Sequence, residues 1–278
     1  MKRIDLSRRA KFRITGEDRI RYLNGQVSND VNKVSPNKSI SACVTTAKGK
    51  LEGHIWIGVN ENNDALLVDT DLNLRESLML RLSKYIISDD VEITDITDDY
   101  LLLHDLEPEN ADGALSIRYG NEGHDHWKRA EELVSGADWM SEKNLEEYRI
   151  FHGIPVWDSE LNFDTLPQEA LLDKISVDFH KGCYVGQEII SRLESVGQVK
   201  RKLVGLKFNS GPLPEPGWEL TDQDNVKVGH VTSACSKEGD LIGLGYVKRN
   251  KLPVKANNIK KNLFSEVVIR HTLFTNSQ

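Results

Sequence analysis

The sequence predicts an α+β protein in which two α+β lobes, close to ferredoxin-like sandwiches, are followed by a C-terminal β-barrel. Three observations carry this prediction. Residues 1–106 alternate strand-like runs with two helical patterns, and a third helical pattern ends at Gly153. Beyond Arg201 only short strand-like runs remain, separated by turns rich in Gly, Pro and Asp. We therefore expect residues 1–201 to form the two lobes and residues 202–278 to form the barrel.

The chain begins with two predicted strands and a short helix. Apolar residues alternate with polar ones on either side of a turn between Leu6 and Phe12. A polar turn at 16–18 leads into RIRYLNGQ, a predicted helix over 19–26 whose end is marked by Asn-Gly. Residues 39–71 then contain three strand-like runs, separated by the turn sequences AKGK and NENND.

Two longer helices and two more strands complete the predicted lobes. Leu74, Leu78, Leu82 and Tyr85 recur at helical spacing, which predicts an amphipathic helix over 72–86. Residues 90–97 and 100–106 return to strand patterns, and the polar, glycine-rich stretch 107–141 predicts loops over short strands. EKNLEEYRIFHG (142–153) predicts the next helix. The barrel strands are expected at 202–208, 217–220, 226–234, 241–249 and 265–274.

Composition limits the class of protein. The chain has 278 residues, 38% hydrophobic and 28% charged, with a formal charge of −7. This is typical of a soluble globular protein and argues against a nucleic-acid coat. Three cysteines form no disulfide framework, which favours a reducing compartment. No run approaches the roughly 18 apolar residues of a membrane span, and the N-terminus lacks a secretory pattern. We predict a cytoplasmic protein without a membrane partner.

The segment most suited to chemistry is KGCYVGQE (181–188), which contains Cys183. Gly182 and Gly186 allow a tight bend or a close backbone approach. A thiol near Lys181 and His180 is expected to have a pKa lowered toward the thiolate, the form that acts as nucleophile or metal ligand. The alternative is that Cys183 is a small buried apolar residue, as most free cysteines are.

Other candidate sites are weaker. No Cys-x-x-Cys accompanies Cys183, so we predict no metal site within this chain, and one cysteine supplies at most one ligand to a shared cluster. His124-x-His126 is interpreted as a solvated loop rather than a metal site. Lys200-Arg201-Lys202 lacks interleaved aromatic residues, so direct nucleic-acid binding is not expected, although an RNA-binding scaffold stays a third hypothesis. Cys43, Cys235, Trp157 and Trp218 are predicted packing residues.

KGCYVGQE with Arg192 four residues on resembles the K-G-C-Y-x-G-Q-E-x-x-x-R signature of the YgfZ family. These folate-binding proteins are related to the glycine-cleavage T-protein, an aminomethyltransferase. Nearly the whole chain resembles the family in the expected order. The resembling blocks are FRITGEDRIRYLNGQVSNDV, ACVTTAKGKLEGHI, YRIFHGIPVWDSEL, LPQEALLD, ISVDFHKGCY and GHVTS.

The resemblance implies a T-protein-like three-lobed ring with tetrahydrofolate in its central opening. It also implies a role in assembling or repairing iron–sulfur clusters of client proteins, including tRNA-modifying enzymes, with activity that depends on Cys183. Folate and iron–sulfur client proteins are the implied partners. The implied cofactor-binding residues are Asn29, Asp30, Lys181, Tyr184, Gln187, Glu188 and Arg192.

Two positions depart from the related patterns. Gly53 and His54 replace the acidic pair of the T-protein, and an imidazole cannot supply the catalytic carboxylate. Whether the chain is an enzyme therefore stays open, with folate-dependent aminomethyltransferase or demethylase activity as the alternative function. Phe151 replaces a glutamate that pairs with the pterin in the family; a phenyl ring stacks on a pterin but accepts none of its N–H groups. Tetrahydrofolate is kept as the predicted ligand.

Overall fold

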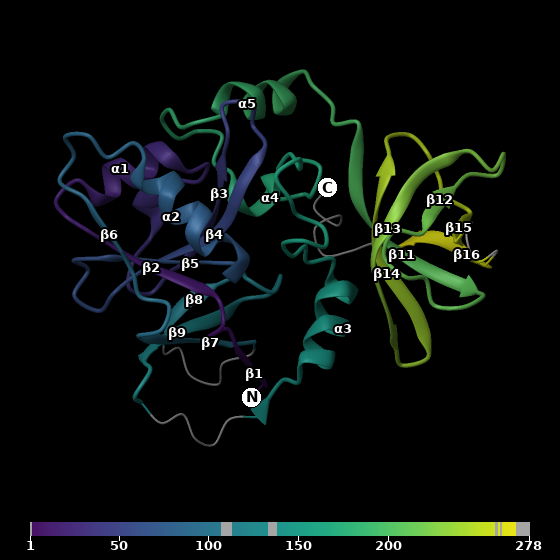
Figure 1. Cartoon of the computed structure of the whole chain (residues 1–278), viewed down its shortest axis with the longest axis horizontal. Coiled ribbons are helices and arrows are strands. Elements are labelled where there is room, and N and C mark those ends of the chain that lie inside the picture. The colour runs from purple at the N-terminus through teal and green to yellow at the C-terminus, as the bar shows by residue number, and fades with distance from the viewer. Residues whose placement is uncertain (1, 107–112, 133–137, 259–260, 262, 271–278) are drawn as a thin grey trace. The chain divides into compact units, whose positions relative to one another are not determined.

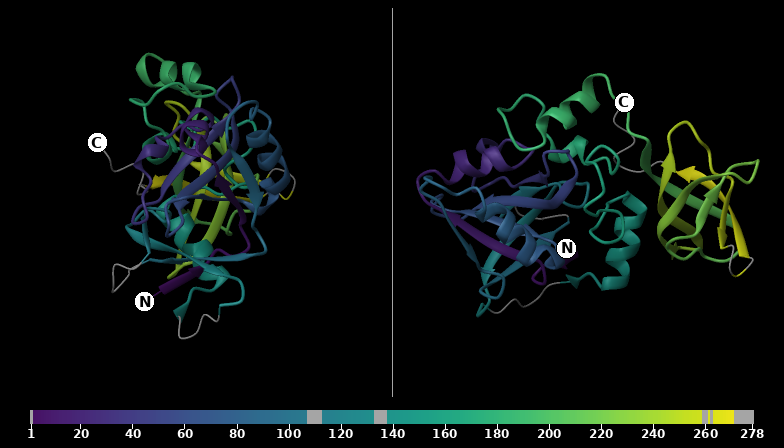
Figure 2. Two further views of the ribbon diagram at one scale, coloured as in Figure 1. Left: turned by 90° about the vertical axis from the view of Figure 1, so that its left-hand side faces the viewer. Right: turned by 45° about the horizontal axis from the view of Figure 1, so that its top comes forward.

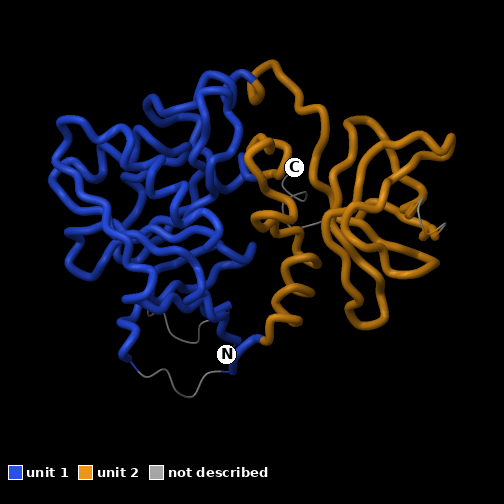
Figure 3. Tube along the Cα trace, in the orientation of Figure 1, with its two compact units in different colours: residues 1–140, 172–192 blue, residues 141–171, 193–278 orange. Residues whose placement is uncertain are grey.

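The computed structural model describes residues 2–106, 113–132, 138–258, 261 and 263–270. The chain divides into two compact units (Figure 3). Unit 1 contains Met1–Met140 and Leu172–Arg192, and unit 2 contains Ser141–Leu171 and Leu193–Gln278. The units are therefore not consecutive stretches, because the chain leaves unit 1 and returns to it before the barrel begins. The predicted domain boundary between residues 201 and 202 stays a prediction.

Unit 1 contains an antiparallel five-stranded sheet, and its five strands fall within runs that the sequence predicted as strands (Figure 1). Its strands, in spatial order, are β3 (Ile40–Thr45), β4 (Leu51–Val59), β5 (Leu66–Thr70), β2 (Ala10–Thr15) and β6 (Glu92–Asp95). Strands β3 and β5 are buried along their whole length, so this sheet forms much of the core of the unit.

Four short helical segments accompany this sheet: α1 (Arg19–Gln26), η1 (Val31–Lys33), η2 (Leu72–Leu74) and α2 (Arg75–Ser83). The helix predicted over 72–86 is thus a 3₁₀ turn followed by an α-helix. Leu74, Leu78 and Leu82 are buried, as expected for one apolar face. Leu78 packs directly over Gly53 of β4, whereas Tyr85 lies beyond the helix and is exposed.

A second five-stranded sheet completes unit 1. Its order is β10 (Asp138–Trp139), β1 (Lys2–Asp5), β7 (Tyr100–Asp105), β9 (Gly123–Arg129) and β8 (Ala114–Ser116). His124 and His126 lie in β9, paired with β7, so the prediction of a solvated loop there was wrong. Their polar sequence hid the strand because only alternate residues of β9 are buried.

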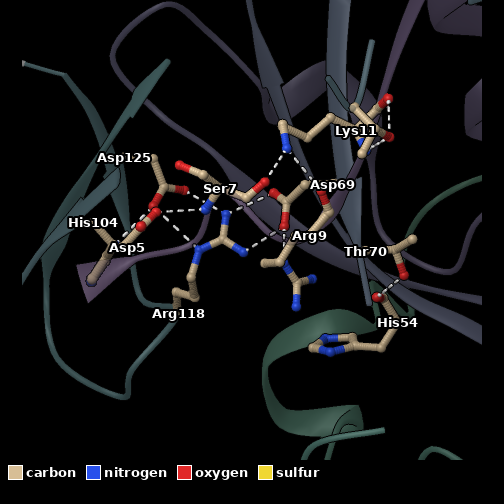
Figure 4. Close-up of polar contacts among 11 residues, drawn as sticks. Asp5, Ser7, Arg9, Lys11, His54, Asp69, Thr70, His104, Arg118 and Asp125 are labelled. Atoms are coloured by element: carbon tan, nitrogen blue, oxygen red, sulfur yellow. Dashed lines mark hydrogen bonds and ion pairs between the residues drawn. The ribbon is translucent and has the colours of Figure 1, made fainter. Parts of the chain in front are cut away.

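A buried ion-pair network joins the two sheets of unit 1 (Figure 4). Arg118 makes two hydrogen bonds to Asp69 of β5, at 2.9 and 2.8 Å, and two to Asp125 of β9, at 3.2 and 2.9 Å. His104 Nδ1 lies 2.8 Å from Asp125. Burial alone would raise the pKa of Asp125, but the Arg118 charge and the His104 contact hold that pKa well below its usual range. Removing any member leaves buried charge without a partner.

Unit 2 contains the third predicted helix and the barrel, which two further views also show (Figure 2). Helix α3 (Glu142–His152) begins after the capping residue Ser141 and ends at Gly153, whose φ of 79° favours glycine. The closed barrel has the order β11 (Arg201–Ser210), β14 (Asp240–Lys248), β13 (Lys227–Lys237), β12 (Glu219–Thr221), β15 (Lys255–Asn258) and β16 (Leu263–Arg270).

The predicted α+β class and the C-terminal barrel are confirmed. Trp218 lies in the barrel core, and Trp157 and Cys43 are buried as predicted, while Cys235 is only partly buried. Strand β15 and the two helices α4 (Asp173–Ser176) and α5 (Gln187–Ser195) were not predicted from the sequence. Among the described residues, the structure has no helix with the length and apolarity needed to span a membrane.

Candidate functional site

The KGCYVGQE segment lies in the loop between α4 and α5 of unit 1, and its last two residues, Gln187 and Glu188, are the first two residues of α5. Cys183 in this loop is exposed. Cys43 is completely buried, and burial raises the pKa of its thiol to about 12. Cys235 is half-buried, and burial likewise raises the pKa of its thiol to about 11. Of the three thiols, that of Cys183 is thus the most exposed in the folded chain.

Gly186 fixes the bend that follows the cysteine. Its φ is +89°, and a Cβ there would lie 2.4 Å from Thr45 Oγ1 and 2.6 Å from the Thr46 carbonyl oxygen. Thr45 Oγ1 also donates to the Val185 carbonyl at 2.7 Å, so the loop is attached to the end of β3. The predicted need for glycine therefore holds at Gly186. It does not hold at Gly182, where φ is ordinary and a Cβ would meet no atom within 4 Å.

Lys181 anchors the loop from its other side. Its ammonium donates to the backbone carbonyls of Asn24, Val27 and Asn29 at 2.6, 2.8 and 2.8 Å. These three bonds use all the donors of an ammonium group, and burial lowers its pKa to about 8. The contacts give Lys181 a structural function, the attachment of the loop to the end of α1. Its predicted ligand contact stays a prediction.

Asn29 and Asp30 are likewise engaged in local contacts. Asn29 Nδ2 donates to the Ser41 carbonyl at 2.8 Å, and its Oδ1 accepts from the Asp30 amide at 2.9 Å. Asp30 caps the 3₁₀ turn η1 by accepting from the Asn32 amide at 3.0 Å. These are the turn and cap contacts expected of such residues. Their contact with a ligand stays a prediction.

The remaining predicted residues flank the loop. Tyr184 is buried, and its ring lies 5.2 Å from the Lys181 ammonium. Gln187, Glu188 and Arg192 lie on α5, with Glu188 and Arg192 exposed. The side chains of Ile189 and Ile190, also on α5, lie against Gly49 in the β3–β4 turn, and that of Ile189 is the nearer. The structure thus gathers Lys181, Cys183, Tyr184 and the α5 residues around one loop.

A cavity of about 470 Å³ adjoins the segment that leads into this loop. Its apolar lining includes Ile40, Ile117 and Phe179, and its polar lining includes Asn29 and Asp178. The Asp178 carboxylate accepts from Lys33 Nζ at 2.6 Å and from the His180 amide at 2.8 Å. Apolar faces together with a carboxylate acceptor suit a flat, N–H-rich ring such as a pterin, so the residues present fit a folate.

Two further features of the described residues bear on ligands. A cavity of about 730 Å³ elsewhere in unit 1 is lined by none of the predicted site residues. No group of three or more His, Cys, Asp or Glu side chains suited to a metal ion occurs in the described part of the chain.

Comparisons with known proteins agree on one group of relatives. No family model matches the chain. A chloroplast protein of Arabidopsis thaliana, provisionally named a transferase, is 28% identical over 88% of this chain and 65% of its own length. A mitochondrial iron–sulfur cluster assembly factor IBA57 homolog of Mycosarcoma maydis is 28% identical over 75% of this chain and 57% of its own length. The chain therefore spans less than two thirds of these two relatives.

A tRNA-modifying protein YgfZ of Hamiltonella defensa is 26% identical over 83% of this chain and 78% of its own length. The chain is a relative of the YgfZ proteins. The crystal structure of glycine cleavage system aminomethyltransferase T from Bartonella henselae superposes with a TM-score of 0.82, at 14% identity, over 98% of this chain and 86% of that chain. The predicted YgfZ resemblance and the T-protein-like fold are both confirmed.

His54, which stands where the T-protein pattern has an acidic residue, is tied to the segment before the YgfZ signature. Its Nε2 lies 3.0 Å from Ser176 Oγ, which lies 2.8 Å from Ser41 Oγ. Burial, together with the charges of Arg9 and Arg118, lowers the pKa of His54 to about 3. A neutral imidazole therefore occupies this position, and no local sequence pattern indicates its contact with Ser176.

Phe151, which replaces the glutamate of the YgfZ pattern, projects from α3 in unit 2 and is 40% exposed. The Lys237 ammonium lies 4.0 Å from the centroid of its ring, and the Arg270 guanidinium lies 4.9 Å from it. The ring is thus already engaged in two cation–π contacts.

Proposed function

We propose that this chain is a folate-binding accessory factor for the assembly or repair of iron–sulfur clusters, which acts through Cys183. The observation that carries the proposal is the exposed thiol of Cys183, displayed by a loop that Gly186 and Lys181 fix from both sides. Two relatives support a role in these processes by their names: one is an iron–sulfur cluster assembly factor IBA57 homolog, and the other is a tRNA-modifying protein YgfZ. The clients would include tRNA-modifying enzymes, and the compartment would be the cytoplasm.

A fixed, exposed thiol suits this function because a thiolate binds iron and one cysteine supplies one ligand. The cluster is then cargo shared with a client protein rather than a resident group. The loop keeps the sulfur at the surface, where a client can supply the remaining ligands. Lys181 and Gly186 would contribute by limiting the positions that the sulfur can take.

The proposed function is tested in a bacterial strain that lacks its own YgfZ protein. We expect expression of this chain to restore the activity of a cluster-dependent enzyme, measured in extracts and normalised to the amount of that enzyme. An empty vector serves as the control. If the chain is expressed and folded but activity stays at the empty-vector level, the proposed function is wrong.

We further propose that tetrahydrofolate binds in the 470 Å³ cavity, with Asp178 as acceptor for the pterin N–H groups. Loss of a hydrogen bond to a charged group typically costs about tenfold or more in affinity. Asp178→Asn should therefore weaken tetrahydrofolate binding by about tenfold or more in calorimetric titration. Glu122→Gln, which neutralises another carboxylate lining the cavity, is the matched control and should bind as wild type does. Equal affinity of wild type and Asp178→Asn would exclude this placement.

A further inference from the structure

Arg9, in the turn between β1 and β2, is fixed at two points while most of its guanidinium stays unused. Its carbonyl oxygen accepts from Lys11 Nζ at 2.8 Å, and its Nε donates to Asp69. Within the described residues, neither of its terminal NH₂ groups has a hydrogen-bond acceptor. In Figure 4 these two nitrogens point away from Arg118, toward the side on which the His54 ring is drawn.

Arg118 in the same network differs from Arg9 in how many of its side-chain donors are used. It makes four hydrogen bonds to two carboxylates, and its side chain is 5% exposed. The Arg9 side chain makes one hydrogen bond to a carboxylate that Arg118 already binds, and it is 24% exposed. Arg118 is therefore a saturated structural cation, whereas Arg9 keeps a fork of donors that solvent or a ligand can reach.

The network also carries an excess of positive charge. Arg9, Lys11 and Arg118 face two buried carboxylates, those of Asp69 and Asp125. Lys11 is completely buried, and its ammonium donates to the carbonyls of residues 7 and 9 instead of to a carboxylate. Two further carboxylates, those of residues 5 and 98, act on Lys11 but are exposed, so solvent screens them. An anion at this place would balance the surplus.

We propose that Arg9 is an oxyanion-binding residue whose two NH₂ groups hold a carboxylate or phosphate group of a small-molecule ligand. A guanidinium fork matches such groups with two parallel hydrogen bonds. The Lys11 and Asp69 contacts fix the fork before the ligand arrives, which lowers the ordering cost of binding. This site depends on neither Cys183 nor folate, so it goes beyond the proposed function.

The test is calorimetric titration of the full chain with inorganic phosphate and, separately, with glutarate. Wild type should bind at least one probe, and the preferred probe identifies phosphate or carboxylate as the natural group. Arg9→Gln should weaken that binding by about tenfold or more. Arg9→Lys keeps the charge but not the fork, so it should bind more weakly than wild type. Arg13→Gln removes an exposed arginine of β2 and should leave affinity unchanged.

Binding should also shift the NMR signals of the His54 ring in wild type and not in Arg9→Gln. Thermal unfolding without ligand checks that each variant is folded; Asp69 keeps its two bonds to Arg118 in Arg9→Gln, so folding is expected. The proposal is overturned if wild type binds neither probe, or if Arg9→Gln and Arg13→Gln weaken binding equally, since that would mean nonspecific surface charge.

Discussion

Cys183→Ser should abolish the ability of the chain to restore a cluster-dependent enzyme, down to the level of the strain without any YgfZ protein. The substitution removes the exposed thiol and changes one atom at a position with no packing role, so folding should be unaffected. A hydroxyl is a poor ligand for iron at neutral pH, because it stays protonated where a thiol ionises. Enzyme activity in extracts, normalised to client protein, is the measurement.

Cys235→Ser is the matched control, since Cys235 is a free cysteine of the same chain that lies half-buried in β13. It should restore activity as wild type does. Wild-type activity in Cys183→Ser would show that the Cys183 thiol is not needed to restore the cluster-dependent enzyme. Equal losses in both variants would indicate a general effect on stability.

Arg118→Met should destabilise the chain by about 3–5 kcal/mol, the range typical of removing one partner from a buried ion pair. Methionine keeps much of the length of the side chain but none of its donors, so Asp69 and Asp125 each lose two hydrogen bonds. The measurement is the free energy of unfolding in urea at pH 7. Arg75→Met is the control, because Arg75 pairs with Asp95 and Asp98 at the surface, and little or no change is expected there.

The same variant should alter the acid sensitivity of the fold. The pKa of Asp125 is held below its usual range in the folded state, so its contribution is present above about pH 4 and lost as the pH falls below that value. Without Arg118 part of this contribution disappears, and stability should depend less on pH in that range. An unfolding free energy within experimental error of wild type at pH 7 would contradict the structural role given to Arg118.

Local patterns were sufficient to predict most elements of the fold. Helix α1 lies at 19–26 as predicted, because a polar turn before it and Asn-Gly near its end are strong local signals. Helix α5 was missed because Gly186 indicated a tight bend in this segment; the positive φ of Gly186 does make that bend, and the helix begins at the next residue. Strand β15 was missed because only Ala256 in KANN is buried.

The site was less predictable, because its contacts join residues that are far apart in the chain. The signature segment was sufficient to predict Cys183 as a site residue, and Cys183 is exposed in the structure. The three carbonyls bound by Lys181 lie more than 150 residues before it, and no local pattern indicates such an arrangement. The same holds for the His54–Ser176 contact, which joins residues 122 positions apart. The unused NH₂ groups of Arg9 could not be predicted from the sequence, because they follow from the way that Arg9 and Arg118 share the Asp69 carboxylate.

The central claim, that a fixed loop presents the Cys183 thiol to partners, is tested most directly by mapping thiol reactivity. The folded chain is treated with a small alkylating reagent for increasing times, and the modified cysteines are identified by peptide mass spectrometry. The account predicts that Cys183 is modified first, Cys235 more slowly, and Cys43 only after unfolding. A folded chain in which Cys183 stays unmodified while Cys235 reacts would contradict it.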